Sequence, residues 1–403
     1  MIGKNLLIKP LTSEEVSKIY DKCLEYLSSK GVEVDHPEAL KILDKAGAQV
    51  EFDNKRVRFP KDIIETALRS APQEMTLADR SESNNLIIPH PSGHFYTLSN
   101  TGARNYLQPD TNTYRDVTLT DVVEWAQLTQ ALDTLDSCAF LTACDVPSKT
   151  ADVYGLKAVF ENTSKHVVVQ PFSFESVKYL FELALVISGS PEALKKRPII
   201  SILGCSMPPF GVKPMDVEII LQASRYGVPI VADSLPSIGA NSPMTIAGTV
   251  LQSSIEILSI IVMSQLFQPG APVLCRPLIC AIDMQSGRPL MSSFDNLLGG
   301  AAGIQFIKDA FCLPAINYSF GTDSYITDGQ AMIEASFGTL MMAMAGSQLQ
   351  GPLGRLNSSA GTSPIKLIID GNIASITKHV ISGVKVDDDT LAWEEILDTP
   401  PGG

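Results

Sequence analysis

The sequence has few of the residues that build metal sites. Its 403 residues include only 5 histidines, and its 7 cysteines are scattered along the chain. A zinc site needs three or four ligands, whereas the loop "PHPSGH" supplies only the close pair His90 and His94. We therefore interpret this pair as loop histidines and expect no zinc. An odd number of scattered cysteines indicates reduced thiols and a cytoplasmic protein.

Three widespread motifs are missing as well. The chain has no G-x-G-x-x-G dinucleotide turn, no G-x-x-x-x-G-K-[ST] phosphate loop and no G-x-S-x-G nucleophile elbow. Basic charge is also in short supply, because 31 Lys and Arg stand against 44 Asp and Glu, for a net charge of −13. This balance disfavours nucleic acid and anionic membranes as partners.

Long hydrophobic runs are rare. The longest, 249–267, is interrupted by Gln252, Glu256 and Gln265, so it predicts a buried helix rather than a membrane span. The composition as a whole, 45% hydrophobic and 19% charged, is typical of a globular protein with a large core. We expect no membrane contact.

The chain does contain a regular alternation of two kinds of segment. Short runs rich in β-branched residues predict buried strands, and longer amphipathic stretches predict helices. The predicted strands are 95–100, 137–144, 166–172, 198–206, 229–237, 272–282, 314–322 and 349–354. The predicted helices are 119–135, 149–164, 174–188, 215–226, 243–267, 293–311, 328–347 and 364–382.

This alternation favours an α/β fold, a (β/α)₈ TIM barrel over residues 95–382. A doubly wound open sheet is the alternative, but it normally carries a glycine-rich nucleotide turn after an early strand. Residues 1–94 predict a helical layer packed on the barrel, with helices over 12–30, 37–46 and 60–70. Residues 383–403 form a C-terminal tail.

The predicted carboxyl ends of the strands carry aromatic and neutral polar side chains. Barrel enzymes place their chemistry at this end. The candidate binding residues are Tyr96, Asn100, Gln170, Phe172, Arg276, Tyr318, Phe320, Thr322, Asp323 and Gln350. No side chain is singled out as catalytic. Aromatic faces with nearby acidic groups suit a quaternary ammonium ion, which donates no hydrogen bonds.

Individual roles follow from side-chain chemistry. We expect Phe172, Tyr318 and Phe320 to surround the cation and Arg276 to bind a carboxylate of the same ligand through two parallel hydrogen bonds. We expect the polar groups Asp323 and Gln350 to orient the ligand.

Structural alternatives remain open for these residues. Large aromatic side chains usually fill space in a core. Arg276 would equally serve as an interior arginine paired with Asp233 or Asp283. In the polar stretch "NYSFGTDSYITDGQ", Thr327 and Gln330 form a T-x-x-Q capping box that predicts the start of a helix. Asp328 would cap the same helix instead.

Four stretches carry a family resemblance. "SKGVEVDHPEALKILDKAGAQVEFDNKRVRFP" is similar to an N-terminal helical segment, and "SPMTIAGTVLQSSIEILSIIVMSQLFQPGAPVL" to a P-x-T-x-A-G … E … Q-L-x-x-P-G-x-P stretch. "TDSYITDGQAMIEA" resembles T-D-S-x-x-x-D-x-Q-x-x-x-E, and "SPIKLIIDGNIASI" resembles S-x-E-x-L-V-I-D-x-E. The chain thereby resembles the trimethylamine methyltransferase (MttB-like) superfamily over nearly its whole length.

The resemblance implies a (β/α)₈ barrel that moves a methyl group from a methylated amine to the cobalt of cob(I)alamin or of a corrinoid protein. No D-x-H-x-x-G stretch, the pattern associated with proteins that hold a corrinoid themselves, occurs in the chain, so a partner is expected to carry the cofactor. The chain has only standard residues and therefore resembles the branch without pyrrolysine. Members of that branch act on quaternary amines; glycine betaine is the expected substrate, and proline betaine, carnitine and γ-butyrobetaine are the other candidates.

Such chemistry makes few demands on the protein. A quaternary nitrogen leaves as a neutral tertiary amine, so the enzyme must orient the N–CH₃ bond and exclude water, without a metal or a base. Two departures put the substrate in question, because Tyr325 stands where many relatives have a lysine and Gln350 lies near where they have a histidine. Relatives also continue past the final "PGG". A homo-oligomer is expected.

Two other functions stay open. The chain would also suit a metal-independent barrel enzyme, such as a lyase, that acts on small amines, or a non-catalytic barrel that binds betaines. Fold alone does not separate these functions.

Overall fold

A closed barrel of eight parallel strands forms the centre of the protein. The computed structural model describes residues 6–402, so residues 1–5 and 403 of the expected end segments lie outside the described part. The barrel strands are β6 (Tyr96–Ser99), β9 (Ser137–Cys138), β10 (His166–Val169), β11 (Ile200–Cys205), β13 (Ile230–Ser234), β15 (Val273–Pro277), β18 (Asn317–Tyr318) and β19 (Leu349–Leu353). They pair in parallel in the order β15-β13-β11-β10-β9-β6-β19-β18, and the ring closes where Cys275 bridges Ala315. The predicted barrel is therefore confirmed, and the open sheet is excluded.

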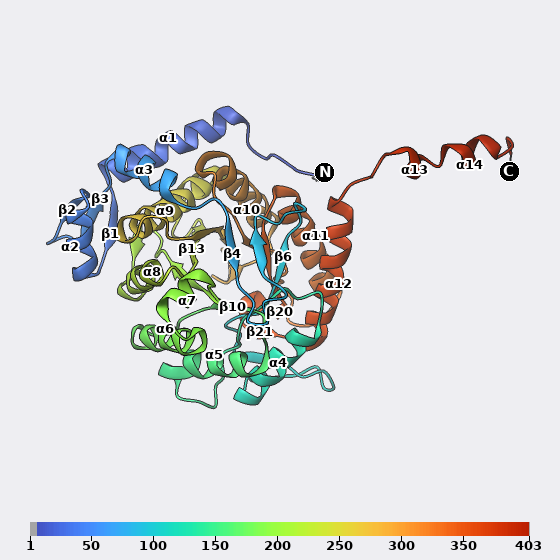
Figure 1. Ribbon diagram of the computed structural model, residues 1–403, viewed down its shortest axis with the longest axis horizontal. Coiled ribbons are helices and arrows are strands. Elements are labelled where there is room, and N and C mark those ends of the chain that lie inside the picture. Colours follow the sequence, from blue (N-terminus) through green and yellow to red (C-terminus); the bar gives the residue numbers. More distant parts are fainter. Residues whose placement is uncertain (1–5, 403) are drawn as a thin grey trace.

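Helices surround the strands, as the view along the barrel shows (Figure 1). They are α4 (Leu119–Ala131), α5 (Ala151–Asn162), α6 (Phe174–Ser188), α7 (Pro191–Lys196), α8 (Pro214–Tyr226), α9 (Ile246–Phe267), α10 (Phe294–Phe306), α11 (Gly329–Ala345) and α12 (Pro364–Ile381). Each predicted helix after residue 95 has a counterpart within a few residues. In the described part of the chain, α9 alone has the length and hydropathy of a membrane span. Its apolar window is 78% buried, so it forms part of the core, as its interrupted sequence predicted.

The strands alternate between two environments. Leu98, Val168, Leu203, Val231 and Leu274 form one apolar cluster inside the ring. Their neighbours along each strand pack outward, into the larger cluster beneath the helices. Because side chains on a strand alternate with period two, this pattern fixes which residues farther along each strand face the interior.

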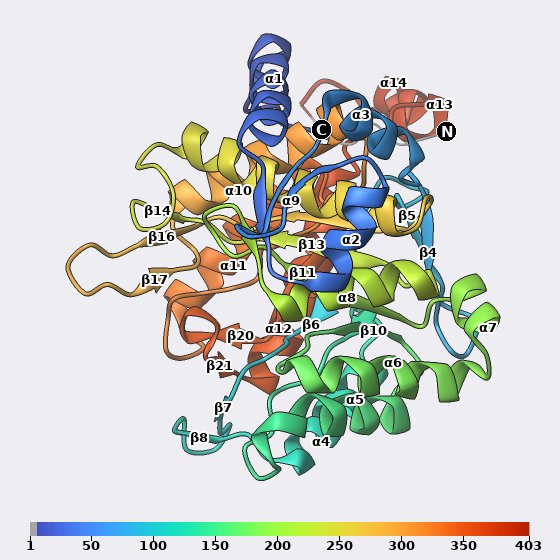
Figure 2. The same ribbon diagram turned by 90° about the vertical axis from the view of Figure 1, so that its left-hand side faces the viewer.

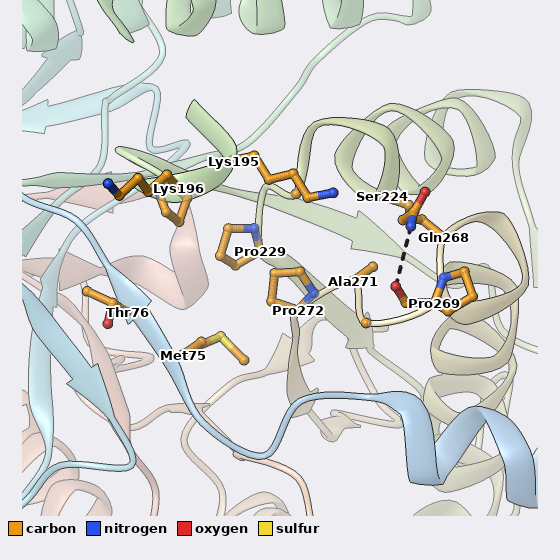
Figure 3. Close-up of a pocket in the computed structure, with 13 residues that line it drawn as sticks. Met75, Thr76, Lys195, Lys196, Ser224, Pro229, Gln268, Pro269, Ala271 and Pro272 are labelled. Carbon is orange, nitrogen blue, oxygen red and sulfur yellow. Dashed lines mark hydrogen bonds between the residues drawn. The ribbon is translucent and has the colours of Figure 1, made fainter. Parts of the chain in front are cut away.

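The amino end of the barrel is covered by a hairpin of β4 (Met75–Leu77) and β5 (Leu86–Ile88). Leu77, Leu86 and Ile88 join the interior cluster from this side. A cavity of 290 Å³ beside the hairpin is lined by Pro229 and Pro272, which directly precede two barrel strands (Figure 3). This cavity therefore lies at the end of the barrel opposite to the expected site.

The N-terminal layer differs in part from expectation. Its helices α1 (Ser13–Ser29), α2 (Pro37–Lys45) and α3 (Lys61–Ser70) were all predicted and pack against α9. Between them lie β1 (Val32–Val34), β2 (Gln49–Glu51) and β3 (Arg56–Arg58), which form a small sheet with β12 (Gly211–Val212). The sequence predicted only helices in this layer, and the strands were missed because three residues are too few to display a period of two.

Two small sheets extend the carboxyl end of the barrel. One contains β7 (Asn105–Leu107), β8 (Tyr114–Asp116), β20 (Arg355–Leu356) and β21 (Gly361–Thr362), and the other β14 (Ser237–Ile238), β16 (Cys280–Ile282) and β17 (Pro289–Leu290). Figure 2 shows them at the end remote from β4 and β5. The short helices α13 (Asp388–Leu391) and α14 (Trp393–Asp398) extend away from the barrel (Figure 1).

Candidate functional site

Five inward-facing side chains end the strands at the carboxyl opening. Gln170, Cys205, Asp233, Arg276 and Tyr318 each lie two residues beyond an apolar residue of the interior cluster. Asp233 and Arg276 are buried, whereas Gln170, Cys205 and Tyr318 are partly exposed. These residues form the floor of the barrel opening, where sequence reasoning placed Gln170, Arg276 and Tyr318.

Arg276 forms a buried ion pair with Asp233 on the neighbouring strand. Its Nε donates to Asp233 Oδ1 over 2.8 Å, and its Nη2 contacts Asp233 Oδ2. Burial acts to lower the pKa of Arg276, but the carboxylate of Asp233 outweighs it and raises that pKa. The structural alternative for Arg276 is thus the one observed, and its Nε and Nη2 are already bound to the carboxylate of Asp233.

Tyr318 lies against two guanidinium groups. The Cζ atoms of Arg276 and Arg355 are 4.0 Å and 4.8 Å from the centre of its ring. Such contacts are favourable because the ring face is electron-rich. The Tyr318 hydroxyl is enclosed and has no hydrogen-bond partner in the described part of the chain. The ring therefore meets cations of the protein itself and contributes to a different site from the expected cage.

Arg355 is a site residue that sequence reasoning missed. The residue is 6% exposed, its Nε donates to Asn100 Oδ1 (3.2 Å), and its Nη2 donates to the Thr101 carbonyl (3.4 Å). Within residues 6–402 it has no carboxylate partner. Burial, reinforced by the charge of Arg276, lowers the pKa of Arg355 to about 10, so the group stays charged at neutral pH. Its place immediately after the eighth strand, in "GPLGRLN", was the signal in the sequence.

Asn100 and Gln170 supply neutral polar groups at the same opening. Asn100 accepts from Arg355 and donates from Nδ2 to the Gly361 carbonyl over 3.3 Å. Gln170 accepts from the hydroxyl of Thr101 over 3.2 Å. Asn100 therefore positions Arg355, while Gln170 borders the opening.

Three predicted site residues point elsewhere. Tyr96 is the first residue of β6 and so lies at the amino end, where its hydroxyl accepts from the Ile87 N–H (3.2 Å). Phe320 comes after β18 has ended and is buried in the cluster beneath the helices. Gln350 follows the inward-facing Leu349 and therefore faces outward, 2.7 Å from the Ser319 hydroxyl. Contrary to expectation, none of these three side chains faces the opening.

Phe172 lines a cavity whose lining does not include Tyr318. This cavity of 580 Å³ follows β6, β9 and β10 and is also lined by Arg104, Cys144 and Lys149. The Phe172 ring packs edge-on against Phe140 with centroids 6.1 Å apart. With Phe320 directed outward, the three expected aromatic rings do not form one cage.

Asp323 and Thr322 hold loops together. Asp323 accepts from the backbone N–H groups of Met291 (2.9 Å) and Ser292 (3.1 Å) and from the Ser358 hydroxyl (2.7 Å). Thr322 is fully buried and donates to Glu334 over 2.5 Å. Asp323 therefore joins the loops after β15, β18 and β19, and its expected role in orienting a ligand is not supported by its contacts.

The helix after β18 is capped by Asp328, the alternative to the Thr327–Gln330 capping box. Asp328 is the N-cap of α11, and its Oδ1 accepts from the Ala331 N–H over 2.9 Å. The expected capping box of Thr327 and Gln330 does not form, because Gln330 donates instead to Glu334 (2.8 Å).

The two loop histidines lie at the amino end. His94 Nε2 is 2.8 Å from the Ser382 hydroxyl, and the His90 ring contacts that of Tyr96 at a tilt of 42°, with centroids 4.6 Å apart. Among residues 6–402, no three His, Cys, Asp or Glu side chains are grouped so as to hold a metal ion.

Asp216 provides a pH-dependent prediction. It is 5% exposed and accepts from the Cys205 N–H over 2.8 Å. Burial raises its pKa to about 6, against the opposing effects of that N–H and of Lys213. A raised acid pKa contributes stability that is present below the unfolded value, about 3.8, and is lost as pH rises through 6.

We therefore expect the free energy of unfolding of Asp216→Asn, measured relative to that of the wild type, to increase as the pH is raised from 4 to 8. The increase should reach up to about 3 kcal/mol, since one pKa unit corresponds to about 1.4 kcal/mol. Urea denaturation of both proteins at the two pH values measures the difference. Parallel pH profiles would contradict the assignment.

Known proteins are similar to this chain in sequence and in fold. The trimethylamine methyltransferase (MTTB) family model matches residues 2–403. The trimethylamine methyltransferase MttB of Desulfitobacterium hafniense is 29% identical over 394 residues, which cover 97% of this chain and 79% of that protein. A glycine betaine methyltransferase from the same species is 26% identical over 401 residues, covering 98% and 81%.

A solved structure agrees on the architecture. The Methanosarcina barkeri monomethylamine methyltransferase (MtmB) superposes with a TM-score of 0.61 at 12% identity, over 92% of this chain and 81% of that one. At this identity the likeness concerns the fold alone. Because the family model covers nearly every residue, the chain belongs to the trimethylamine methyltransferase (MTTB) family of methyltransferase enzymes.

Proposed function

We propose that this enzyme transfers a methyl group from a carboxylated quaternary amine, glycine betaine first among them, to the cobalt of a corrinoid carried by a partner protein. Family membership supports the methyl transfer, and a relative named glycine betaine methyltransferase supports the substrate class. The two arginines at the barrel opening are the reason for proposing a substrate with a carboxylate.

Around the Tyr318 ring, positive charge is in excess. Arg276 and Arg355 both contact Tyr318, but only Arg276 has a carboxylate partner. A buried charge without a partner is costly, so a ligand carboxylate beside Arg355 would be stabilised. A simple methylammonium ion would be repelled by the same excess. A betaine satisfies both conditions because its carboxylate would face the arginines and its methylated nitrogen would face the opening.

The chain's own residues have a limited task in this reaction. They bind and orient the zwitterion, hold the carbon–nitrogen bond toward the opening and exclude water. No proton has to move, because a quaternary nitrogen leaves as a neutral amine. The aromatic cage expected from Phe172, Tyr318 and Phe320 is not retained in this proposal, and Tyr318 is assigned to the carboxylate end.

The exposed rim of the barrel opening fits a docked partner. Met207, Met244, Met284, Phe294 and Tyr325 lie in segments that follow barrel strands and are 41%, 67%, 71%, 73% and 52% exposed. Methionine and aromatic residues are enriched at protein interfaces, and such a rim would receive the partner's corrinoid. When bound, the corrinoid supplies a strongly nucleophilic cobalt that accepts the methyl group. The cytoplasmic location and the homo-oligomeric state remain predictions.

The test is an anaerobic methyl-transfer assay with cob(I)alamin as acceptor. We expect loss of the cob(I)alamin absorbance with glycine betaine or another betaine, and at least tenfold slower transfer with choline, tetramethylammonium or trimethylamine. Dimethylglycine, the demethylated product, serves as the negative control. A folded enzyme that uses no quaternary amine would leave the lyase or the betaine-binding function. Equal rates with trimethylamine and glycine betaine would contradict the charge argument.

A further inference from the structure

We propose that Arg355 binds the carboxylate of the substrate and thereby sets the preference for carboxylated over uncarboxylated amines. The inference rests on the proposed function and deepens it by assigning a residue to the anionic end of the ligand. It also replaces Arg276, the arginine that the sequence suggested for this role.

The two arginines differ in what they already bind. Arg276 donates from both Nε and Nη2 to the carboxylate of Asp233, in a pair whose side chains are 2% and 6% exposed. Arg355 donates only to neutral oxygens, the amide of Asn100 and the carbonyl of Thr101, at the longer distances of 3.2 and 3.4 Å. A guanidinium offers five N–H groups in a planar fork that matches a carboxylate. Both arginines use Nε and Nη2 and leave Nη1 without a partner in residues 6–402, but Arg355 alone of the two has no carboxylate beside it.

The Arg355 Nη1 has no hydrogen-bond partner in residues 6–402 and is not fully enclosed, although the residue as a whole is only 6% exposed. The Arg355 guanidinium lies over the ring of Tyr318, which is partly exposed and whose hydroxyl is enclosed and has no partner in residues 6–402. A carboxylate beside Nη1 would receive a charge-assisted hydrogen bond and would neutralise Arg355, whose charge the Asp233–Arg276 pair does not balance.

The backbone around Arg355 is held firmly. Arg355 pairs with Thr362 in the β20–β21 ladder, and the preceding Gly354 N–H donates to buried Asp370 over 2.7 Å. Asn100 is in turn fixed by the Gly361 carbonyl. A binding group fixed in this way loses little conformational entropy when a ligand arrives, which favours affinity.

The experiment separates binding from reaction. 3,3-Dimethylbutanoate is the carbon isostere of glycine betaine; it keeps the carboxylate and has no methyl group to transfer. Calorimetry would measure its affinity, and that of glycine betaine and choline, for the wild type, Arg355→Gln and Arg104→Gln. Arg104→Gln is the matched control, because Arg104 is an exposed guanidinium at the same end of the barrel that lines the 580 Å³ cavity.

We expect Arg355→Gln to lower the affinity for glycine betaine and for 3,3-dimethylbutanoate by about 10- to 150-fold, the range for hydrogen bonds to charged groups. Its affinity for choline should change less than threefold. Asn100→Ala should lower the affinity for both carboxylate ligands by a smaller factor, about three- to tenfold, because the Arg355 side chain loses its hydrogen bond to Asn100. Arg104→Gln should leave all three affinities unchanged.

The outcomes distinguish the two proposals. If the wild type binds 3,3-dimethylbutanoate and Arg355→Gln does not, the inference holds even if no methyl transfer is found. If methyl transfer from betaine proceeds but Arg355→Gln leaves the betaine-to-choline ratio unchanged, the inference is overturned. It is overturned as well if Arg104→Gln causes the same loss of carboxylate affinity. If Arg355→Gln fails to fold, Arg355→Lys is measured instead, because lysine keeps the positive charge but lacks the planar guanidinium. An Arg355→Lys protein with unchanged affinity for carboxylates would overturn the inference.

Discussion

Replacing Asp233 by alanine is expected to lower the free energy of unfolding by about 3–5 kcal/mol. Asp233 is the only ion-pair partner of Arg276 in residues 6–402, and both side chains are almost fully enclosed. Without it, Arg276 and Arg355 would be two buried guanidinium groups around one tyrosine ring with no carboxylate between them. Losing one partner of a buried pair is costly because the other charge remains desolvated.

Urea denaturation at pH 7 measures this effect, and a double variant provides its control. Asp233→Leu/Arg276→Met removes both charges and keeps an apolar volume, so we expect it to recover most of the lost stability. Far-UV circular dichroism checks that each variant keeps its fold. An Asp233→Ala protein within about 1 kcal/mol of the wild type would show that the pair contributes no more than an exposed one.

Replacing Lys366 by methionine is expected to have an effect of similar size, a loss of about 3–5 kcal/mol. Lys366 and Asp370 are both fully buried on α12, and Nζ lies 2.8 and 2.7 Å from the two carboxylate oxygens. Nζ also donates to the Phe320 carbonyl over 3.0 Å. Since burial already raises the pKa of Asp370, removing the lysine would leave that carboxylate without its counter-charge.

This pair also connects the loops that hold the site. Lys366 binds the chain just after β18, and Asp370 binds Gly354 just before Arg355. Lys366→Met should therefore lower both stability and 3,3-dimethylbutanoate affinity. The double variant Lys366→Met/Asp370→Asn keeps an acceptor for the Gly354 N–H, and we expect it to recover part of both losses. An unchanged unfolding midpoint for Lys366→Met would refute the assignment.

The sequence by itself determined the architecture. Eight β-branched runs alternating with eight amphipathic stretches are a local signal, and from it each strand of the barrel and each helix around it except the short α7 was recognisable. The end of the barrel that carries polar groups was predictable too, because strand direction fixes it. Gln170, Arg276 and Tyr318 were correctly placed at the opening for this reason.

Only the tertiary structure decided what those residues do. Whether Phe320 or Gln350 faces the interior depends on where a strand ends and on its period of two, and an error of one residue reverses the face. The pairing of Arg276 with Asp233 joins residues 43 positions apart, and the contact of Arg355 with Asn100 joins residues 255 apart. Such contacts leave no local pattern in the sequence, because they arise only when strand pairing brings the two residues together. Which arginine is occupied, and which remains open to a ligand, is therefore a property of the closed barrel.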